Sequence, residues 1–219
     1  MELLADMSAE DRRQVLASGR RRRFSPREVV FHEGDPADTF LLLDSGRVAV
    51  RAATPMGDTV TFAVVGPGET VGELALIDSG ARRSASVVAL EATEAWSFSA
   101  DTFHRLRRTN AGADAFVLQT LAAQVRRLSG LLVEALHLPV ETRVLRRLTD
   151  LERVYRGSSD PTQIPLTQDE LASLAGASRA TVNKVLRDLA AVGLLELRRG
   201  RVVVLDPAGL ERRGSSGLS

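Results

Sequence analysis

Two short polar segments in the first half of the chain carry residue types that bind anions: Gly72, Glu73, Leu74 and Ala75, then Arg83 and Ser84. Backbone N–H groups at the start of a short helix after Gly72 can hold an anion. Arg83 adds a positive charge and a two-pronged donor, Ser84 adds a hydroxyl, and Glu73 can accept a hydrogen bond. We therefore expect these segments to bind a small anionic ligand. The alternative is an internal salt bridge between Glu73 and Arg83, with neighbouring Arg82 a solvated residue.

A second group of polar residues lies in the last quarter of the chain, around two short helical segments. Residues 167–170 read Thr-Gln-Asp-Glu, the form of a capping box in which Thr167 caps a helix and Glu170 is its third residue. Gly176 stands where a short turn must reverse the chain, and Ser178 can cap the next helix. The polar faces of that second helix carry Arg179, Asn183, Lys184 and Arg187.

Two apolar runs, Leu194–Leu197 and Val202–Leu205, follow these helices and predict a β-hairpin. Two short helices around a glycine turn, followed by a hairpin, form a winged helix-turn-helix, whose second helix enters the major groove of DNA. Arg179 and Lys184 can donate to guanine or to phosphate, and Thr181 can contact a phosphate. The alternative is a small helical bundle with a solvated polar face.

The composition indicates a soluble protein with two small domains. The chain has 219 residues, 44% of them hydrophobic and 26% charged, and no apolar run approaches the roughly 18 residues that cross a bilayer. The N-terminus lacks the basic and apolar regions of a signal peptide. We therefore expect a cytoplasmic protein without a membrane partner. From Pro139 onward there are 13 basic and 10 acidic residues, which is compatible with binding nucleic acid.

Residue types that hold metals are scarce. The absence of cysteine excludes disulfides, thiolate-held iron–sulfur clusters and cysteine-based zinc sites. His32, His104 and His137 are isolated, which argues against a metal site, a haem site and a metal-dependent enzyme of the cupin type. The sequence therefore predicts neither a metal, haem or iron–sulfur cofactor nor an enzyme.

The elements that must position these residues differ along the chain. From about Glu28 to Phe98, short apolar runs separated by glycines predict the many short strands of a β-barrel or sandwich, with residues 44–46 as a hairpin turn. A long helix is predicted from about Ala113 to His137, and another from Val140 to Tyr155. Pro139 disfavours helix at the residue before it and marks a hinge.

The long helix has apolar residues spaced 3, 4, 3, 4 and 3 apart: Leu118, Leu121, Val125, Leu128, Leu132 and Ala135. This spacing is that of a heptad seam carried through about five turns. Two interpretations stay open. The stripe can pack on the chain's own barrel, or it can form a parallel coiled coil with a second subunit.

The segment from Leu166 to Leu186, with Ser178, Arg179, Thr181 and Val182 at its centre, resembles the helix-turn-helix of the cyclic-AMP receptor protein and fumarate-nitrate regulator (Crp/Fnr) family of bacterial transcription regulators. The segments around Glu73 and Arg83 are similar to that family's phosphate-binding cassette, including the distance between its halves. In such a cassette Glu73 would accept from a ribose 2′-OH. The resemblance covers about Phe24 to Leu205.

The resemblance implies an α+β fold in four parts. These are a cyclic-nucleotide-binding-type β-barrel (jelly roll) over residues 1–110, a dimerisation helix and hinge over 111–138, a winged helix-turn-helix over 139–211, and a disordered tail over 212–219. It implies a homodimer through the Leu118–Ala135 helix, palindromic double-stranded DNA as partner, and cyclic AMP or another cyclic nucleotide monophosphate as effector. RNA polymerase is a candidate further partner.

The sequence departs from the family pattern at two places. Ala180 stands where the family usually places a glutamate, and alanine cannot accept a hydrogen bond from cytosine. Leu128-Ser129 stands where cyclic-AMP-binding members present a Thr-Ser pair to the adenine, and leucine cannot bond the adenine amino group. The usual half-site and adenine selectivity therefore do not follow directly.

The main expectation is a ligand-regulated, sequence-specific DNA-binding transcription regulator. The first rival is a regulator whose barrel has lost its ligand and which binds DNA without an effector. The second is a cupin-like enzyme fused to a helical domain, which the scattered histidines disfavour. The sequence does not indicate activation or repression, nor which genes are controlled.

Overall fold

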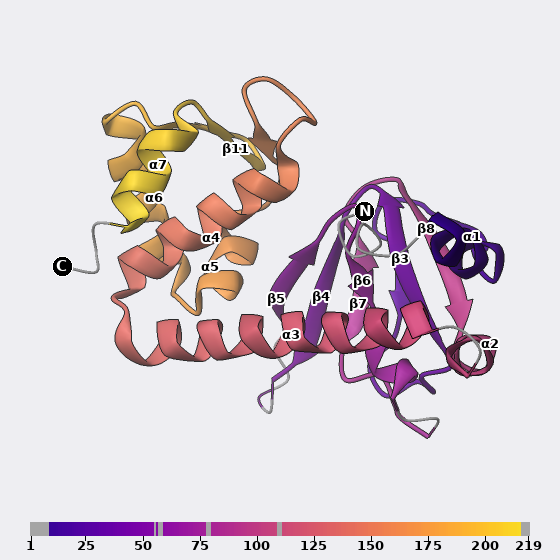
Figure 1. Ribbon diagram of the computed structural model, residues 1–219. Coiled ribbons are helices and arrows are strands. Elements are labelled where there is room, and N and C mark those ends of the chain that lie inside the picture. Colours follow the sequence, from indigo (N-terminus) through magenta and orange to yellow (C-terminus); the bar gives the residue numbers. More distant parts are fainter. Residues whose placement is uncertain (1–8, 55, 57–58, 78–79, 109–110, 216–219) are drawn as a thin grey trace. The chain divides into compact units, whose positions relative to one another are not determined.

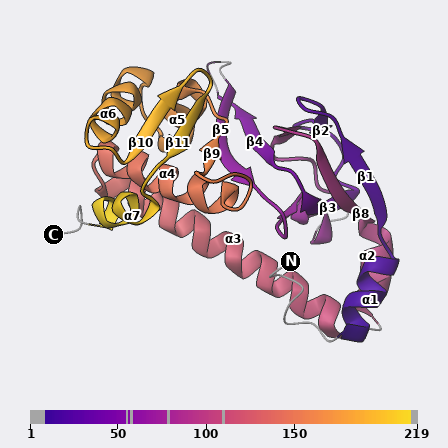
Figure 2. The same ribbon diagram turned by 90° about the horizontal axis from the view of Figure 1, so that it is seen from above.

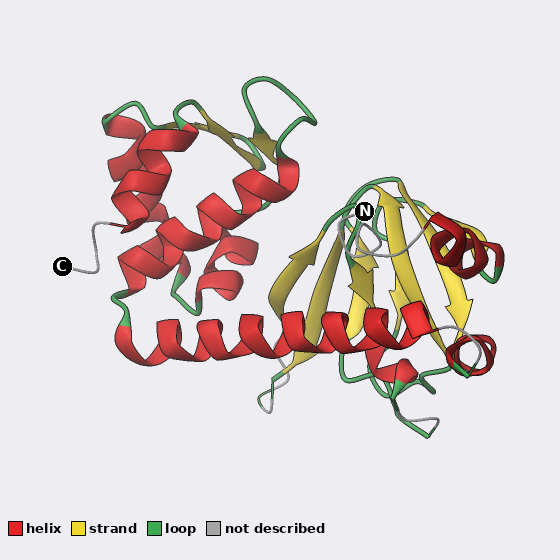
Figure 3. Ribbon diagram, viewed as in Figure 1, coloured by secondary structure: helices red, strands yellow, loops and turns green. Residues whose placement is uncertain are grey.

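The computed structural model describes residues 9–54, 56, 59–77, 80–108 and 111–215. Their contacts divide the chain into two compact units, the first built mainly from residues up to Leu128 and the second mainly from the residues after it (Figure 1). Most strands belong to the first unit, and helices dominate the second, which has one small sheet (Figure 3). No helix among the described residues has the length and apolar character needed to span a membrane.

The first unit is an antiparallel β-structure with helices at its flanks. Its elements are α1 (Ala9–Ala17), β1 (Arg20–Phe24), β2 (Val29–Phe31), β3 (Thr39–Ser45), β4 (Val48–Ala53), β5 (Thr59–Val65), β6 (Thr70–Val71), the 3-10 helix η2 (Glu73–Leu76), β7 (Ser86–Ala89), β8 (Thr93–Ser99), α2 (Ala100–Arg107) and the long α3 (Ala111–His137). One four-stranded sheet has the order β1-β8-β3-β6, and the other has the order β2-β7-β4-β5. These sheets confirm the predicted barrel type of fold.

Strand β3 contains an unbroken apolar run, Phe40 to Leu43, because both of its faces are buried. Successive side chains of a strand point to opposite faces. Leu41 and Leu43 pack in a core that both sheets contribute to, together with residues such as Val48 of β4 and Val87 of β7. The alternate residue Phe40 packs on the other side of its sheet. A strand buried on both faces therefore has no polar alternation.

The second apolar cluster joins the sheet to the flanking helices. Phe40 of β3 stacks on Phe98 of β8, with ring centroids 4.9 Å apart, and meets Phe103 of α2 edge-on at 5.1 Å. Val15 of α1 and Phe116 of α3 complete the cluster. Helices α1 and α2 lie at the same end of this unit (Figures 1 and 2). The aromatic cluster thus fixes the start of α3 against the barrel.

The heptad seam of α3 lies on a different side of the helix from this packing. The residues that pack on the barrel are Ala113, Phe116 and Val117, all buried. The seam residues Leu118 and Val125 are 67% and 62% exposed. Leu121 is the exception, because it packs partly against the aromatic cluster. The described part of this chain therefore leaves most of the seam uncovered.

The described part of the second unit combines the helices α4 to α7 with a small sheet. Its elements are α4 (Val140–Tyr155), β9 (Gln163–Ile164), α5 (Gln168–Ala175), α6 (Arg179–Ala191), β10 (Leu195–Arg198), β11 (Arg201–Val204) and α7 (Pro207–Ser215). The sheet order is β10-β11-β9, all antiparallel. The break between α3 and α4 falls at Leu138 and Pro139, as predicted. Strands β10 and β11 confirm the predicted hairpin.

The strand β1 was not predicted, and the turn at residues 44–46 was predicted wrongly. Four arginines precede Phe24 in β1, so the strand has no apolar alternation; it forms because it pairs at the edge of its sheet with β8. Strands β3 and β4 belong to different sheets, so the turn that includes Gly46 crosses between sheets rather than closing a hairpin.

The prediction of a disordered tail from Arg212 is wrong for its first four residues, because α7 continues to Ser215. The helix begins after Asp206, whose Oδ1 accepts from the Gly209 amide at 2.8 Å. Leu210 is fully buried, and Glu211 forms an ion pair with Arg153 of α4. Packing on α4 therefore extends the helix beyond what its polar composition indicates. Residues 216–219 lie outside the described part of the chain.

Candidate ligand-binding and DNA-binding sites

Gly72 lets the guanidinium of Arg83 lie against the backbone where η2 begins. Gly72 has φ 81° and ψ 20°, a left-handed conformation that favours glycine. A Cβ at this position would lie 2.7 Å from Nη1 of Arg83 and 3.1 Å from the ring of Phe31. A glycine is therefore required at position 72 for two reasons: the left-handed backbone conformation and the close approach of the Arg83 guanidinium.

Arg83 is a buried cation whose hydrogen-bonding capacity is not filled. Its residue surface is 6% exposed, its Nη2 donates to Thr39 Oγ1 at 3.1 Å, and Asp38 Oδ1 lies 3.7 Å away. Its guanidinium lies 3.7 Å above the ring of Phe31. Nε and Nη1 are buried without a hydrogen-bond partner. Burial lowers the pKa of Arg83, and Asp38 opposes that shift.

The backbone around Arg83 is fixed by the neighbouring loop. The Arg83 amide donates to Asp35 O at 2.8 Å, and the Gly34 amide donates to Arg83 O at 2.9 Å. Arg82 is exposed, and its Nη1 donates to Gly34 O at 2.7 Å. The structure therefore separates two adjacent arginines, one turned outward to the loop and one buried beside η2.

The other residues expected in the cassette differ in exposure. Ala75 is fully buried and anchors η2, whereas Leu74 is 41% exposed and Ser84 is exposed. Glu73 and Arg83 are both described, and the carboxylate within 4 Å of Arg83 is that of Asp38, so the alternative of an internal salt bridge between Glu73 and Arg83 is wrong. Burying a cation with unmet donors is costly unless an anion supplies acceptors.

Three residues near the guanidinium were not anticipated from the sequence. Phe31, Asp38 and Thr39 lie more than forty positions before Arg83 in the chain. No local pattern marks them as ligand-binding residues. A run of strand residues ending in Phe31 signals only a core position, and the antiparallel pairing of β2 with β7 brings it near Arg83.

Leu128 and Ser129 lie on α3 and are exposed in this chain, Leu128 to 49%. Leu128 belongs to the exposed heptad seam, and Ser129 follows it. Their expected role toward a nucleotide base stays a prediction.

The two helices of the expected DNA-binding motif begin and end as predicted. Thr167 Oγ1 accepts from the Glu170 amide at 3.2 Å, and Glu170 Oε2 accepts from the Thr167 amide at 2.8 Å. Gly176 ends α5 in the left-handed conformation, with φ 57°. Ser178 Oγ accepts from the Thr181 amide at 3.2 Å and caps α6. These bonds confirm the capping box and the second cap.

Helix α6 has one apolar face and one polar face. The buried residues are Val182, Val185, Leu186 and Leu189. The exposed ones include Arg179, Ala180, Lys184 and Arg187, with Thr181 and Asn183 half-buried. Arg179 is paired with Asp169 of α5, with Nη1 and Oδ2 3.3 Å apart. The exposed face therefore offers cations at the start and the middle of the helix.

The hairpin β10–β11 adds arginines that sequence reasoning did not single out: Arg198, Arg199 and Arg201. Arg198 bonds Glu196 through Nε and Nη2, both at 2.9 Å, which lowers the pKa of Glu196 and raises that of Arg198. Arg201 donates to Gln163 Oε1 at 2.9 Å. The sequence pattern that could have indicated them is the group of three arginines around the turn at Gly200.

A groove of about 340 Å³ lies between the start of α5, Arg179 and this hairpin. Its lining includes Arg179 at the start of α6, and the second helix of a helix-turn-helix is the one that enters the major groove of DNA. Among the described residues, no group of three or more histidine, aspartate or glutamate side chains could hold a metal ion.

Comparison with known proteins identifies both domains. Residues 21–110 match the family model described as the cyclic nucleotide-binding domain, and residues 142–213 match the Crp-like helix-turn-helix domain. The "Cyclic AMP receptor protein" of Thermus thermophilus is 35% identical over 211 residues, covering 95% of this chain and 94% of that protein. The "CRP-like cAMP-activated global transcriptional regulator" of Mycobacterium tuberculosis is 32% identical over 188 residues, 84% of each.

Solved structures give the same result. The c-di-GMP-responsive global regulator CLP of Xanthomonas campestris matches with a TM-score of 0.74 and 30% identity, over 90% of this chain and 99% of that one. FixK2 of Bradyrhizobium japonicum, 16% identical, shares the fold with a TM-score of 0.75 over 89% of this chain and 96% of that one.

The fold and the two sites define a two-domain regulator with a ligand-sensing barrel and a winged helix-turn-helix. The chain belongs to the Crp/Fnr family of bacterial transcription regulators. It is a ligand-regulated, DNA-binding transcription regulator, as the sequence predicted.

Proposed function

We propose that the protein is a homodimeric regulator that binds a cyclic nucleotide monophosphate, with cyclic AMP the first candidate, in the barrel of each subunit. Gly72, Glu73 and Ala75 with Arg83 and Ser84 form the phosphate and ribose site. Binding shifts the population of geometries around Leu138 and Pro139 and thereby changes the affinity for a palindromic DNA site. The shift requires that the ligand prefer one hinge geometry.

The observation that carries this proposal is the buried guanidinium of Arg83, whose Nε and Nη1 have no hydrogen-bond partner. A bound phosphate would accept charge-assisted hydrogen bonds from this guanidinium. The position of Gly72 beside Nη1 leaves no side chain between the phosphate and the start of η2. An effector-independent regulator would gain nothing from such a buried, unmet cation.

The choice of base is a separate question, because Leu128 offers no hydrogen bond to an adenine amino group. Relatives differ in this respect as well, since one is named as cAMP-activated and another as c-di-GMP-responsive. We propose that the phosphate and ribose contacts supply most of the affinity and that Leu128 weakens discrimination between purine bases.

Calorimetric titration of the full-length protein tests this proposal. Cyclic AMP, cyclic GMP and c-di-GMP are each titrated into the wild type, Arg83→Ala and Arg82→Ala. We expect saturable binding of a cyclic mononucleotide that Arg83→Ala abolishes and Arg82→Ala retains. Similar affinities for cyclic AMP and cyclic GMP would support the role of Leu128. No heat with any nucleotide, together with unchanged DNA affinity, would establish the effector-independent alternative.

The DNA-binding residues proposed are Thr167, Ser178, Arg179, Ala180, Thr181, Asn183, Lys184 and Arg187. Thr167, Ser178 and Thr181 lie at helix starts, where hydroxyl and amide groups suit phosphate contacts. Arg179, Asn183, Lys184 and Arg187 can meet base edges or phosphates from α6, and Ala180 contributes only apolar contact. We further propose a cytoplasmic protein without catalytic activity, with RNA polymerase as a candidate contact.

A further inference from the structure

The ion pair between Asp169 and Arg179 connects the two helices of the DNA-binding motif. Asp169 is the second residue of α5 and Arg179 is the first residue of α6. Their side chains are 65% and 67% exposed, so the pair lies on the surface. Because surface ion pairs contribute little to stability, this pair has little structural value in the free protein.

Asp169 is unusual within the groove between α5, α6 and the hairpin. Among the described residues that line the groove, it is the only acidic one, against four arginines: Arg179, Arg198, Arg199 and Arg201. A carboxylate on a surface that approaches DNA phosphates opposes binding to any sequence. Its presence there therefore weakens general DNA affinity.

Arg179 has few other groups to orient it. Ala180 offers no polar atoms in its side chain, and the hydroxyl of Thr181 lies 2.9 Å from that of Ser178, which it bonds. Asp169 holds Nη1 of Arg179 and leaves Nε and Nη2 for other partners. A guanidinium held at one side presents its remaining N–H groups in a fixed direction, and less side-chain freedom is then lost on binding.

We propose that Asp169 is a positioning residue that directs Arg179 to a guanine and so determines the base specificity of α6. The aspartate fixes the direction of the guanidinium, which donates to guanine O6 and N7. At the same time its charge reduces binding to other sequences. This inference rests on the proposed function of α6 and deepens it.

Selection from a pool of randomised DNA duplexes tests the proposal, with duplexes long enough for two half-sites about one helical turn apart. The full-length wild type, Asp169→Ala, Arg179→Ala and the double variant are compared, with and without cyclic AMP. Asp188→Ala on α6 is the matched control, since it removes the same charge from an exposed position outside the groove.

We expect Arg179→Ala to lose the preference for one base pair in each half-site. Asp169→Ala should relax the preference at that same base pair by roughly tenfold and bind the unselected pool more tightly. Asp188→Ala should keep the preference at every position. In the double variant, the additional loss of Asp169 should not weaken the base preference at any further position of the half-site.

Two results would overturn the proposal, and they are distinguishable. If Arg179→Ala loses the preference and Asp169→Ala keeps it, Arg179 reads the base without help from Asp169, and the proposed function of α6 stands. If Arg179→Ala changes no base preference, both the proposed function of Arg179 and the role of Asp169 are wrong. Circular dichroism of each variant checks that the helices are retained.

Discussion

At the scale of single residues, the proposed anion site depends on Gly72 and Arg83 together. Gly72 has a left-handed conformation, a Cβ there would lie 2.7 Å from Nη1 of Arg83, and Nε and Nη1 of Arg83 are buried without a hydrogen-bond partner. The two effects can be separated, because Gly34 also has a positive φ, 85°, but a Cβ there meets nothing within 4 Å.

We expect Gly72→Ala to lose cyclic nucleotide binding and Gly34→Ala to keep it. Each substitution places an alanine in a left-handed conformation, which costs about 1–2 kcal/mol of stability. Only Gly72→Ala also displaces Arg83 and Phe31. Thermal unfolding and nucleotide titration of both variants measure the two effects. Equal losses of binding would show that backbone strain alone, rather than the contact with Arg83, is responsible.

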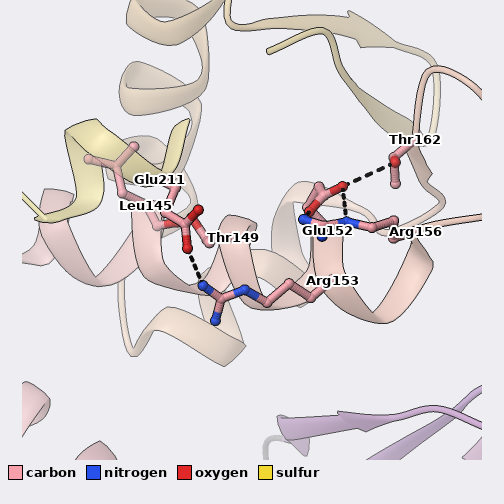
Figure 4. A network of polar contacts seen from close by, with 7 residues as sticks. All are labelled: Leu145, Thr149, Glu152, Arg153, Arg156, Thr162 and Glu211. Atoms are coloured by element: carbon pink, nitrogen blue, oxygen red, sulfur yellow. Dashed lines mark hydrogen bonds and ion pairs between the residues drawn. The ribbon is translucent and has the colours of Figure 1, made fainter. Parts of the chain in front are cut away.

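At the scale of elements, charged side chains of α4 contact Thr162 and Glu211 on other segments of the second unit (Figure 4), and they differ in burial. Glu152 is 2% exposed, accepts from Arg156 Nη2 at 2.6 Å, and accepts from Thr162 Oγ1 at 3.3 Å, which ties α4 to the segment leading into β9. The next residue, Arg153, forms an ion pair with Glu211 of α7, and both of these side chains are 55% exposed.

We expect Glu152→Ala to lower the free energy of unfolding of the second unit by about 1–3 kcal/mol, because it leaves the buried Thr162 hydroxyl without its acceptor. Arg153→Ala is the control and should change it by roughly 0–1 kcal/mol, since its ion pair is solvated. Urea unfolding followed by circular dichroism compares them. Similar decreases in the free energy of unfolding for the two variants would contradict a stabilising contact of Glu152 between α4 and the segment that follows it.

At the scale of the whole molecule, the exposed seam of α3 bears on assembly. Leu118, Val125 and Leu132 are 60–67% exposed and follow the heptad spacing. Exposed apolar stripes of this kind mark protein–protein contacts. A homodimer through α3 would cover them and would pair two copies of α6 for a palindromic site.

We expect Val125→Asp to convert the protein to a monomer and to weaken binding to a palindromic site far more than binding to a single half-site. A charge in the seam must be buried on dimerisation, which is costly. Sedimentation velocity measures the mass. Val133→Asp is the control, because Val133 is 57% exposed but lies outside the seam. A dimeric Val125→Asp would mean that another surface joins the subunits.

The sequence alone determined the elements whose signals are local. The capping box at Thr167, the cap at Ser178 and the break at Pro139 depend on neighbouring residues, and the structure has them where the sequence places them. The short apolar runs determined the strands of the barrel, and the spacing around Val182 determined which face of α6 is buried.

Only the tertiary structure decided features that depend on residues far apart in the chain. Strand β1 exists because its arginines pair with β8, and α7 extends to Ser215 because it packs on α4. The partners of Arg83, and the pairing of Asp169 with Arg179 across the turn, likewise come from folding. The physical reason is that caps and periodicity act within a few residues, whereas burial and pairing depend on which distant segments meet.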